Sequence, residues 1–379
     1  MKVLHLASFS GNAGDCLNHK GFRPWFETFF SEKVQWVEFE IRDVYRKYKN
    51  FEDDLLVASK NVDLLVIGGG NYLELWPENS STGTSLDLTD KFLAESDTPI
   101  FFNALGVDDG QGIGSSARLN FEKFILRITE EEKYLVSIRN DGSMSALTKH
   151  LGMVPNVHQI PDHGFFGEKG SPQPPRVQSE GFTVGINLAV DMKEIRFENF
   201  SGVDEFISEI AECLEAFHEL TNCKFKFFPH VMSDLVAASN LLMKLPDRIA
   251  RDFFEVSKLS TARDSCADIF KEYDECNLVI ANRFHSNVYA IRSGIPVIGL
   301  SNYPQIVNLY KELNYLPQCV DVSFPGFSGE LLNCLVNTSK DADSLTSGLN
   351  AVNGELFKIR QEFEMILREW LVDNGFPSC

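Results

Sequence analysis

Short apolar runs alternate with amphipathic segments over nearly the whole chain, and this alternation constrains the fold more than any other feature. In the first half, the runs that predict strands are residues 3–9, 34–39, 64–67, 100–104, 135–138 and 157–160. The segments between them that predict helices are residues 17–30, 51–58, 115–128 and 143–151. Strand, helix and strand in turn are typical of an α/β fold, in which helices cover both faces of a parallel sheet.

The densest cluster of proline, glycine and serine, residues 167–175, predicts a linker. The alternation then restarts, with strands expected at residues 183–188, 225–228, 278–281 and 297–300 and a long helix at 203–220. An amphipathic helix expected at about 354–370 has no strand after it. We therefore expect two Rossmann-like, doubly wound domains that face each other across a cleft. The expected division is an N-terminal domain at 1–170, a C-terminal domain at 181–345, and a segment at 346–379 whose helix packs back toward the first domain.

Charge and cysteine content narrow the class of protein. A formal net charge of −19 over 379 residues argues against a nucleic-acid groove or an anionic membrane surface as the main partner. The eight cysteines include no C-x-x-C pair, which favours reduced, buried thiols over a disulfide framework or a zinc site. The chain shows no signal-peptide pattern and no apolar run long enough to span a bilayer. We expect a cytoplasmic enzyme with small-molecule substrates, without metal, nucleic-acid partner or transmembrane segment.

The segment Asn282-Arg283-Phe284-His285-Ser286 follows the apolar run 278–281 and precedes an amphipathic stretch. It is therefore expected where a buried strand ends and a helix begins. On an extended strand end, Arg283 and His285 would point to the same side. A guanidinium, an imidazole and a hydroxyl beside free helix N–H groups make an anion site with a proton donor. The alternative is a capping arginine beside a buried, hydrogen-bonded histidine.

Two glycine-containing turns also follow predicted strands. In Gly11-Asn12-Ala13-Gly14-Asp15 the glycines allow a ligand to approach the backbone, and Asn12 or Asp15 could contact it or cap the next helix. This turn is neither a G-x-G-x-x-G fingerprint nor a P-loop. In Gly68-Gly69-Gly70-Asn71, three glycines weaken the strand end, and close approach of a ligand is the usual reason for such a weakness.

Arg139, Asp162 and His230 lie at the ends of further predicted strands. Arg139 could bind a substrate or cap the helix expected from Ser143. Asp162 could orient a histidine or a substrate hydroxyl, or form an Asx-turn. His230 could contact an acceptor or a phosphate, with capping as the alternative. We treat all three as candidate substrate-binding residues.

Taken in order, these pieces resemble the polysaccharide pyruvyltransferase family, over residues 8 to 313. The matching motifs are an N-x-G-D turn at Asn12 to Asp15, G-G-G at Gly68 to Gly70, S-x-R-D-x-x-S at Ser137 to Ser143, Pro161-Asp162, and R-x-H-x-x-x-x-A-x-x-x-G-x-P from Arg283 to Pro296. The chain departs from the family pattern in three places. The family often has an arginine near Ala189, an aspartate at Asn140 and a lysine at Gln305.

The resemblance implies a GT-B-like pair of Rossmann domains that transfers pyruvate from phosphoenolpyruvate to two hydroxyls of a sugar, in a surface glycan or its precursor, without a cofactor. It implies an acceptor side in the first domain and a donor side in the second. Arg283 would hold the donor's anionic groups and His285 would be the acid or a phosphate ligand. The other substrate-binding candidates are Asn12, Asp15, Gly69, Gly70, Asn71, Arg139, Asp162, His230, Phe284 and Ser286. Two alternatives stay open: a GT-B glycosyltransferase that uses a nucleotide sugar, and a non-catalytic sugar- or anion-binding protein. The acceptor sugar, the regiochemistry and the oligomeric state are also open.

Overall fold

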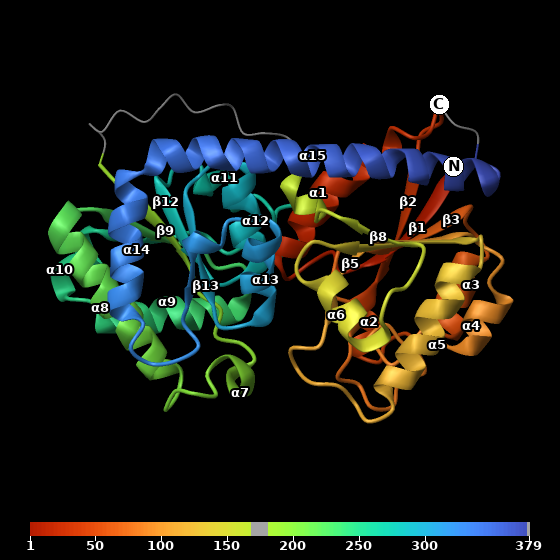
Figure 1. Cartoon of the computed structure of the whole chain (residues 1–379), viewed down its shortest axis with the longest axis horizontal. Coiled ribbons are helices and arrows are strands. Elements are labelled where there is room, and N and C mark those ends of the chain that lie inside the picture. Colours follow the sequence, from red (N-terminus) through yellow and green to blue (C-terminus); the bar gives the residue numbers. More distant parts are fainter. Residues whose placement is uncertain (168–180, 377–379) are drawn as a thin grey trace. The chain divides into compact units, whose positions relative to one another are not determined.

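The computed structural model describes residues 1–167 and 181–376, and it divides the chain into two compact units (Figure 1). Unit 1 consists of Met1–Phe9, Asn18–His163 and Leu356–Cys379, and unit 2 of Ser10–Leu17 and Gly164–Glu355. The expected linker falls mostly on residues 168–180, which lie outside the described residues. Two segments belong to a different unit from the residues that precede them in the chain. The turn after the first strand belongs to unit 2, and the end of the last helix belongs to unit 1.

Unit 1 is built on a six-stranded sheet in which every strand pairing is parallel. Its strands are β1 (Lys2–Ala7), β2 (Gln35–Glu40), β3 (Leu64–Gly68), β5 (Ile100–Leu105), β7 (Tyr134–Arg139) and β8 (Val157–Ile160). Their spatial order is β2-β1-β3-β5-β7-β8. The order reverses between β1 and β3, and ligands of open α/β sheets bind at the carboxyl ends of strands beside such a reversal. A short parallel pair, β4 (Leu73–Glu74) and β6 (Val107–Asp108), follows the ends of β3 and β5.

Helices connect these strands, and apolar side chains fill both faces of the sheet. The helices are α2 (Ile41–Tyr45), α3 (Asp53–Ser59), α4 (Asp90–Glu95), α5 (Ala117–Glu130) and α6 (Ser143–Leu151), with most of α1 (Ala13–Glu27). Successive residues of a strand point to opposite faces, so Phe101 and Phe102 of β5 enter different cores. Phe102 packs edge-on against Phe124, whereas Phe101 stacks on Phe363 with ring centroids 6.0 Å apart. The end of the last helix therefore completes one face of unit 1.

Unit 2 has a second six-stranded sheet, also with parallel pairings throughout. Its strands are β9 (Thr183–Asn187), β10 (Lys224–Phe227), β11 (Phe254–Val256), β12 (Leu278–Ala281), β13 (Val297–Ser301) and β14 (Cys319–Asp321). Their order, β11-β10-β9-β12-β13-β14, is that of a Rossmann fold and reverses between β9 and β12. The ends of β9 and β12 therefore form the expected ligand-binding edge of unit 2.

The helices of unit 2 are α7 (Lys193–Arg196), α8 (Val203–Thr221), α9 (Met232–Lys244), α10 (Asp247–Asp252), α11 (Phe270–Tyr273), α12 (Phe284–Arg292), α13 (Pro304–Glu312) and α14 (Ser328–Lys340). The last helix, α15 (Ala342–Asp373), begins earlier than the sequence predicts. Its first part belongs to unit 2, where Thr346 donates to the carbonyl of Gly294 (3.0 Å) and Asn353 to that of Ile291 (2.8 Å). Contacts with the end of α12 therefore order a segment whose own sequence is polar.

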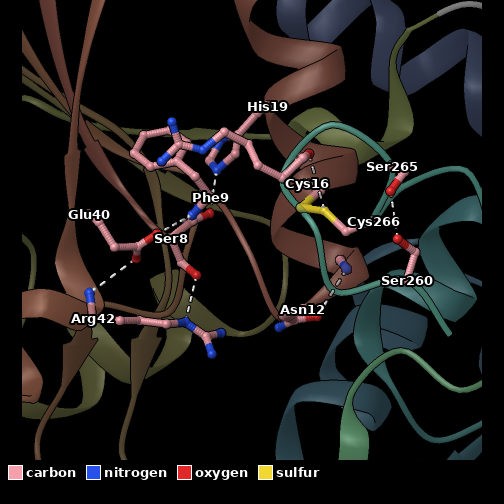
Figure 2. Close-up of a disulfide and its surroundings, with 12 residues drawn as sticks. Ser8, Phe9, Asn12, Cys16, His19, Glu40, Arg42, Ser260, Ser265 and Cys266 are labelled. Carbon is pink, nitrogen blue, oxygen red and sulfur yellow. Dashed lines mark hydrogen bonds between the residues drawn. A yellow bond between two sulfur atoms is a disulfide. The ribbon is translucent and has the colours of Figure 1, made fainter.

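The expectation that all cysteines are reduced is wrong for one pair. Cys16 and Cys266 form a disulfide within unit 2, with Cα atoms 6.3 Å apart (Figure 2). They are 250 residues apart in sequence, so no spacing motif could have revealed the pairing. Cys213, Cys223, Cys276, Cys319 and Cys334 are free, and Cys379 lies outside the described residues. In the described part of the chain, no helix combines the length and apolar character that crossing a membrane requires.

Candidate functional site

Arg283 lies at the topological switch point of the unit 2 sheet. Strand β12 ends at Ala281 and α12 begins at Phe284, so Asn282 and Arg283 form the turn between them. The amide of Asn282 ties this turn to the segment after β9, because its Oδ1 accepts a hydrogen bond from the backbone N–H of Ala189 (2.6 Å). The two strand ends that flank the switch point are thus held together.

Two carboxylates fix the guanidinium of Arg283. Asp234 accepts from both Nε (2.8 Å) and Nη2 (2.5 Å), and Asp191 accepts from Nη2 at 2.7 Å. The side chain of Arg283 is 14% exposed and that of Asp234 is 0% exposed. Burial lowers the pKa of Arg283, but attraction to Asp234 and then Asp191 outweighs burial and raises it overall. The site therefore contains a permanent, rigidly oriented cation.

Asp234 also caps the helix that follows β10. Its Oδ2 accepts from the backbone N–H of His230 at 2.9 Å and of Val231 at 3.3 Å, at the start of α9. Its role as a partner of Arg283 was not predicted from the sequence. The signal present was an aspartate in the first turn of a helix after a strand end, which predicts a cap and gives no indication of a distant arginine.

His285 lies in the first turn of α12 and is 8% exposed. The helix begins one residue before it, so the expected extended path from Arg283 to His285 is wrong: only Arg283 is extended. The imidazole packs against Gly14, where an added Cβ would lie 2.2 Å from Nδ1. Only glycine fits at that position without moving the ring.

The turn that carries Gly14 is anchored in unit 2. The backbone N–H of Gly11 donates to the carbonyl of Thr261 (2.9 Å) and that of Ala13 to the carbonyl of His230 (3.1 Å). The disulfide between Cys16 and Cys266 fixes the first turn of α1, which also contains Gly14 (Figure 2). These ties bring the turn from the first strand to the side of His285.

Asn12 and Asp15 have local roles in this turn. Asn12 Oδ1 accepts from the backbone N–H of Gly14 at 3.0 Å, which closes an Asx-type turn. Asp15 lies in the first turn of α1, where a carboxylate is favoured by the helix dipole. Their contact with a substrate stays a prediction.

His230, Tyr273 and Ser286 form a buried hydrogen-bond chain. His230 Nε2 is 2.8 Å from the hydroxyl of Tyr273, which in turn hydrogen-bonds the hydroxyl of Ser286. None of the three is more than 1% exposed. Burial, followed by the charges of Arg283 and His285, lowers the pKa of His230 well below its usual value. His230 is therefore neutral at physiological pH.

Phe284 packs edge-on against His285, with ring centroids 5.1 Å apart.

The glycines of unit 1 are required by close packing at the end of β3. Gly69 has a φ of +85°, and an added Cβ would lie 2.5 Å from Oδ1 of Asn18. At Gly70 an added Cβ would lie 2.3 Å from the ring of Tyr72. The next residue, Asn71, donates from Nδ2 to Asp108 at 2.7 Å. These contacts explain the glycines without a ligand, and the binding roles of Gly69, Gly70 and Asn71 stay predictions.

Arg139 and Asp162 belong to a buried ionic network at the ends of β7 and β8. Arg139 donates from Nε to Asp141 (2.5 Å), and its Nη1 lies 3.8 Å from Oδ2 of Asp162. Asp162 also accepts from Nδ2 of Asn18 (2.9 Å), and its backbone N–H donates to Asn140 (3.0 Å). Arg139 is 3% exposed and Asp162 is 0% exposed.

The candidate site residues form two groups, one in each unit. Unit 1 holds Gly69, Gly70, Asn71, Arg139 and Asp162, and unit 2 holds Asn12, Asp15, His230, Arg283, Phe284, His285 and Ser286.

Glu74 makes the stability of unit 1 depend on pH. It lies opposite Asp108 in the register of β4 and β6 and accepts from Gln111 at 3.1 Å. Burial, followed by repulsion from Asp108, raises the pKa of Glu74 from 4.5 to about 7. Between these values the folded state keeps a proton that the unfolded state releases, so stability falls as pH rises through this window.

We expect Glu74→Gln to remove this pH dependence. In the unmodified chain, the free energy of unfolding should fall between pH 4.5 and about 7 by at most about 3 kcal/mol. Urea unfolding at a series of pH values measures it, with the exposed Glu122→Gln of α5 as the matched control. Equal slopes in the unmodified chain and in Glu74→Gln would contradict the assignment.

The sequence profile of the family described as Polysaccharide pyruvyl transferase matches residues 18–303, well over half of the chain. No curated protein sequence matches the chain.

Solved structures with similar folds share little sequence with the chain. The putative UDP-N-acetylglucosamine 2-epimerase from Listeria monocytogenes has a TM-score of 0.57 and 9% identity, over 92% of this chain and 90% of that chain. The S. aureus MnaA–UDP co-structure has a TM-score of 0.59 and 9% identity, over 100% and 99%. The glycosyltransferase from Rickettsia africae ESF-5 has a TM-score of 0.57 and 8% identity, over 98% of both. At this identity the likeness concerns the fold alone, and it confirms the predicted GT-B-like class of two Rossmann-like α/β units.

Proposed function

Because the chain belongs to the polysaccharide pyruvyl transferase family and is therefore a transferase, we propose that its donor is phosphoenolpyruvate. The pyruvyl group is moved onto two hydroxyls of a sugar, as a ketal, in a surface glycan or its precursor. The observation that carries this proposal is the position of Arg283 and His285, two residues apart, at the switch point of unit 2. A fixed guanidinium suits the carboxylate and phosphate of the donor, and an imidazole in the first turn of the same helix suits the donor's need for a proton.

The proposed reaction has three steps, and atoms and charges balance over them. A proton is added to the methylene carbon of the enol, which leaves an oxocarbenium ion at the neighbouring carbon. One sugar hydroxyl attacks that carbon and releases its proton, and a second hydroxyl then displaces phosphate and gives its proton to the leaving group. The products are the pyruvyl ketal and inorganic phosphate, and no redox cofactor or metal enters the balance.

Three residues of unit 2, Arg283, His285 and Gly14, each have a part in this scheme. Arg283 binds the donor's oxyanions and opposes the charge that develops on the phosphate. His285 delivers the proton to the methylene carbon, a contribution typically of ~10²–10⁴ in rate, and it can recover a proton from the first hydroxyl. Gly14 leaves room for the imidazole. Among the candidates of unit 1, the partly buried Asn71 recognises the acceptor, because an amide pairs well with sugar hydroxyls, whereas the buried Arg139 and Asp162 hold the strand ends in place.

The test is transfer by the purified full chain. Phosphoenolpyruvate is incubated with a panel of free, nucleotide-linked and lipid-linked sugars, and both phosphate release and the product mass are followed. Phosphate release that coincides with a mass gain of one pyruvate less one water supports the proposal. Nucleoside diphosphate release from a nucleotide sugar alone indicates a glycosyltransferase. Binding of donor and sugars without any product indicates a non-catalytic family member.

A further inference from the structure

A second buried arginine lies beside Arg283. Arg196, the last residue of α7, is 9% exposed and has its guanidinium 4.9 Å from the ring centroid of Tyr303. Its Nη1 donates to Oδ1 of Asn302 at 3.0 Å, just after the end of β13. Its Nε lies 3.4 Å from Oδ1 of Asp191. Arg196 was not among the candidate residues predicted from the sequence.

One carboxylate joins the two arginines. Oδ1 of Asp191 faces Arg196, and Oδ2 accepts from Nη2 of Arg283 at 2.7 Å. This bridging carboxylate has the geometry that a bound oxyanion would adopt between two guanidinium groups. Burial raises the pKa of Asp191, but Arg283 and then Arg196 lower it overall, so the bridge is ionised at neutral pH.

The two aspartates on Arg283 differ in how firmly they are held. Asp234 is 0% exposed and also accepts two backbone N–H groups at the start of α9, so it cannot leave without breaking a helix cap. Asp191 is 36% exposed, and among the described residues its ionic and hydrogen-bonding partners are the two arginines alone. Asp191 is therefore the carboxylate that can be displaced.

A buried amide next to Arg196 provides an independent indication of a ligand. Asn302 is 5% exposed, and while its Oδ1 is engaged by Arg196, its Nδ2 has no hydrogen-bond partner within the described residues. A buried hydrogen-bond donor without a partner destabilises the folded state. An oxyanion that bridges the arginines would supply the acceptor that Asn302 lacks.

We propose that Asp191 occupies the position of one oxyanion of the donor and that the donor displaces it, bridging Arg196 and Arg283 with Asn302 as an additional donor of a hydrogen bond. The inference rests on the proposed function in that it takes the donor to be anionic. With Asp191 in place, the two arginines are balanced by two aspartates. When Asp191 swings out, the remaining group carries one net positive charge, which the incoming oxyanion neutralises. The donor thus competes with a carboxylate of the chain itself.

The competition predicts an unusual result: removing a charge from the site strengthens binding of an anion. Asp191→Asn keeps the size of the side chain but weakens both ion pairs, so phosphoenolpyruvate and inorganic phosphate should bind roughly tenfold more tightly. Arg196→Gln should weaken the binding of both by roughly tenfold or more, and the double variant should show no gain from Asp191→Asn. Titration calorimetry of the full chain measures all of these affinities.

Two further variants separate this role from general charge and fold effects. Asp321→Asn, at the exposed end of β14 on the same edge of the sheet, should leave both affinities unchanged. Arg196→Lys, which keeps the charge but not the planar fork, should bind less tightly than the unmodified chain even if Arg196→Gln fails to fold. Equal or weaker anion binding by Asp191→Asn would overturn the inference and would make Asp191 a residue that orients the arginines.

The binding assay also distinguishes failure of the inference from failure of the proposed function. If phosphate binds with this dependence on Asp191 and Arg196 but no ketal forms, the proposed function fails and the inference stands. If ketal forms and the affinities for phosphoenolpyruvate are equal in all variants, the function stands and the inference fails.

Discussion

Arg283→Ala is expected to destabilise the folded chain by about 3–5 kcal/mol and to abolish measurable donor binding. The large cost in stability arises from Asp234, which is 0% exposed and would keep a buried charge without its main cationic partner. The loss of binding arises because the guanidinium is the central cation of the proposed donor site. Urea unfolding and titration calorimetry with phosphoenolpyruvate measure the two effects.

A compensated variant separates these two effects of Arg283. In Arg283→Leu combined with Asp234→Asn, no uncompensated charge is buried, while the asparagine still offers an oxygen to the cap of α9. Most of the stability should return and donor binding should not. Arg251→Ala, at a site 75% exposed, is the control and should change stability by less than about 0.5 kcal/mol. An Arg283→Ala protein as stable as this control would contradict the structural part, and donor binding by the compensated variant would contradict the functional part.

The apolar periodicity was sufficient to predict the central strands but not the edges of unit 2. Strands β11 and β14 were missed because each has only three residues and is half exposed, so neither forms an apolar run. The start of α1 was placed too late, since Gly14 is a poor helix former and its contacts with distant residues are invisible in a sequence. The first turns of α15 were missed because Gly348 and several polar residues there are typical of a loop.

Prediction of the candidate site from the sequence meets the same limit as prediction of the fold. A strand end followed by a helix start could be read from the segment around Arg283 and His285 alone. The partners of Arg283 could not, because Asp234 and Asp191 lie 49 and 92 residues away and are brought to it by the parallel order of β9, β10 and β12. A single sequence contains local periodicity, but it does not state which strand ends become neighbours.

His285→Gln is expected to lower kcat by ~10²–10⁴ and to leave the affinity for phosphoenolpyruvate largely unchanged. Glutamine keeps a hydrogen-bond donor but cannot deliver a proton, so the variant removes acid catalysis while it preserves polar contacts. Steady-state kinetics and direct binding of the donor together measure the split between turnover and affinity.

Two variants test whether the position of the imidazole matters as well as its presence. Gly14→Ala retains His285 but places a methyl group where the ring now lies, 2.2 Å from Nδ1, so it should also lower kcat. His150→Gln removes a histidine of α6 that pairs with Asp109 in unit 1, and it should leave kcat unchanged. If His285→Gln lost affinity but not turnover at saturating donor, the imidazole would be a phosphate ligand and not the acid. If His285→Gln had full activity, another group would have to supply the proton, and the role assigned to the first turn of α12 would be wrong.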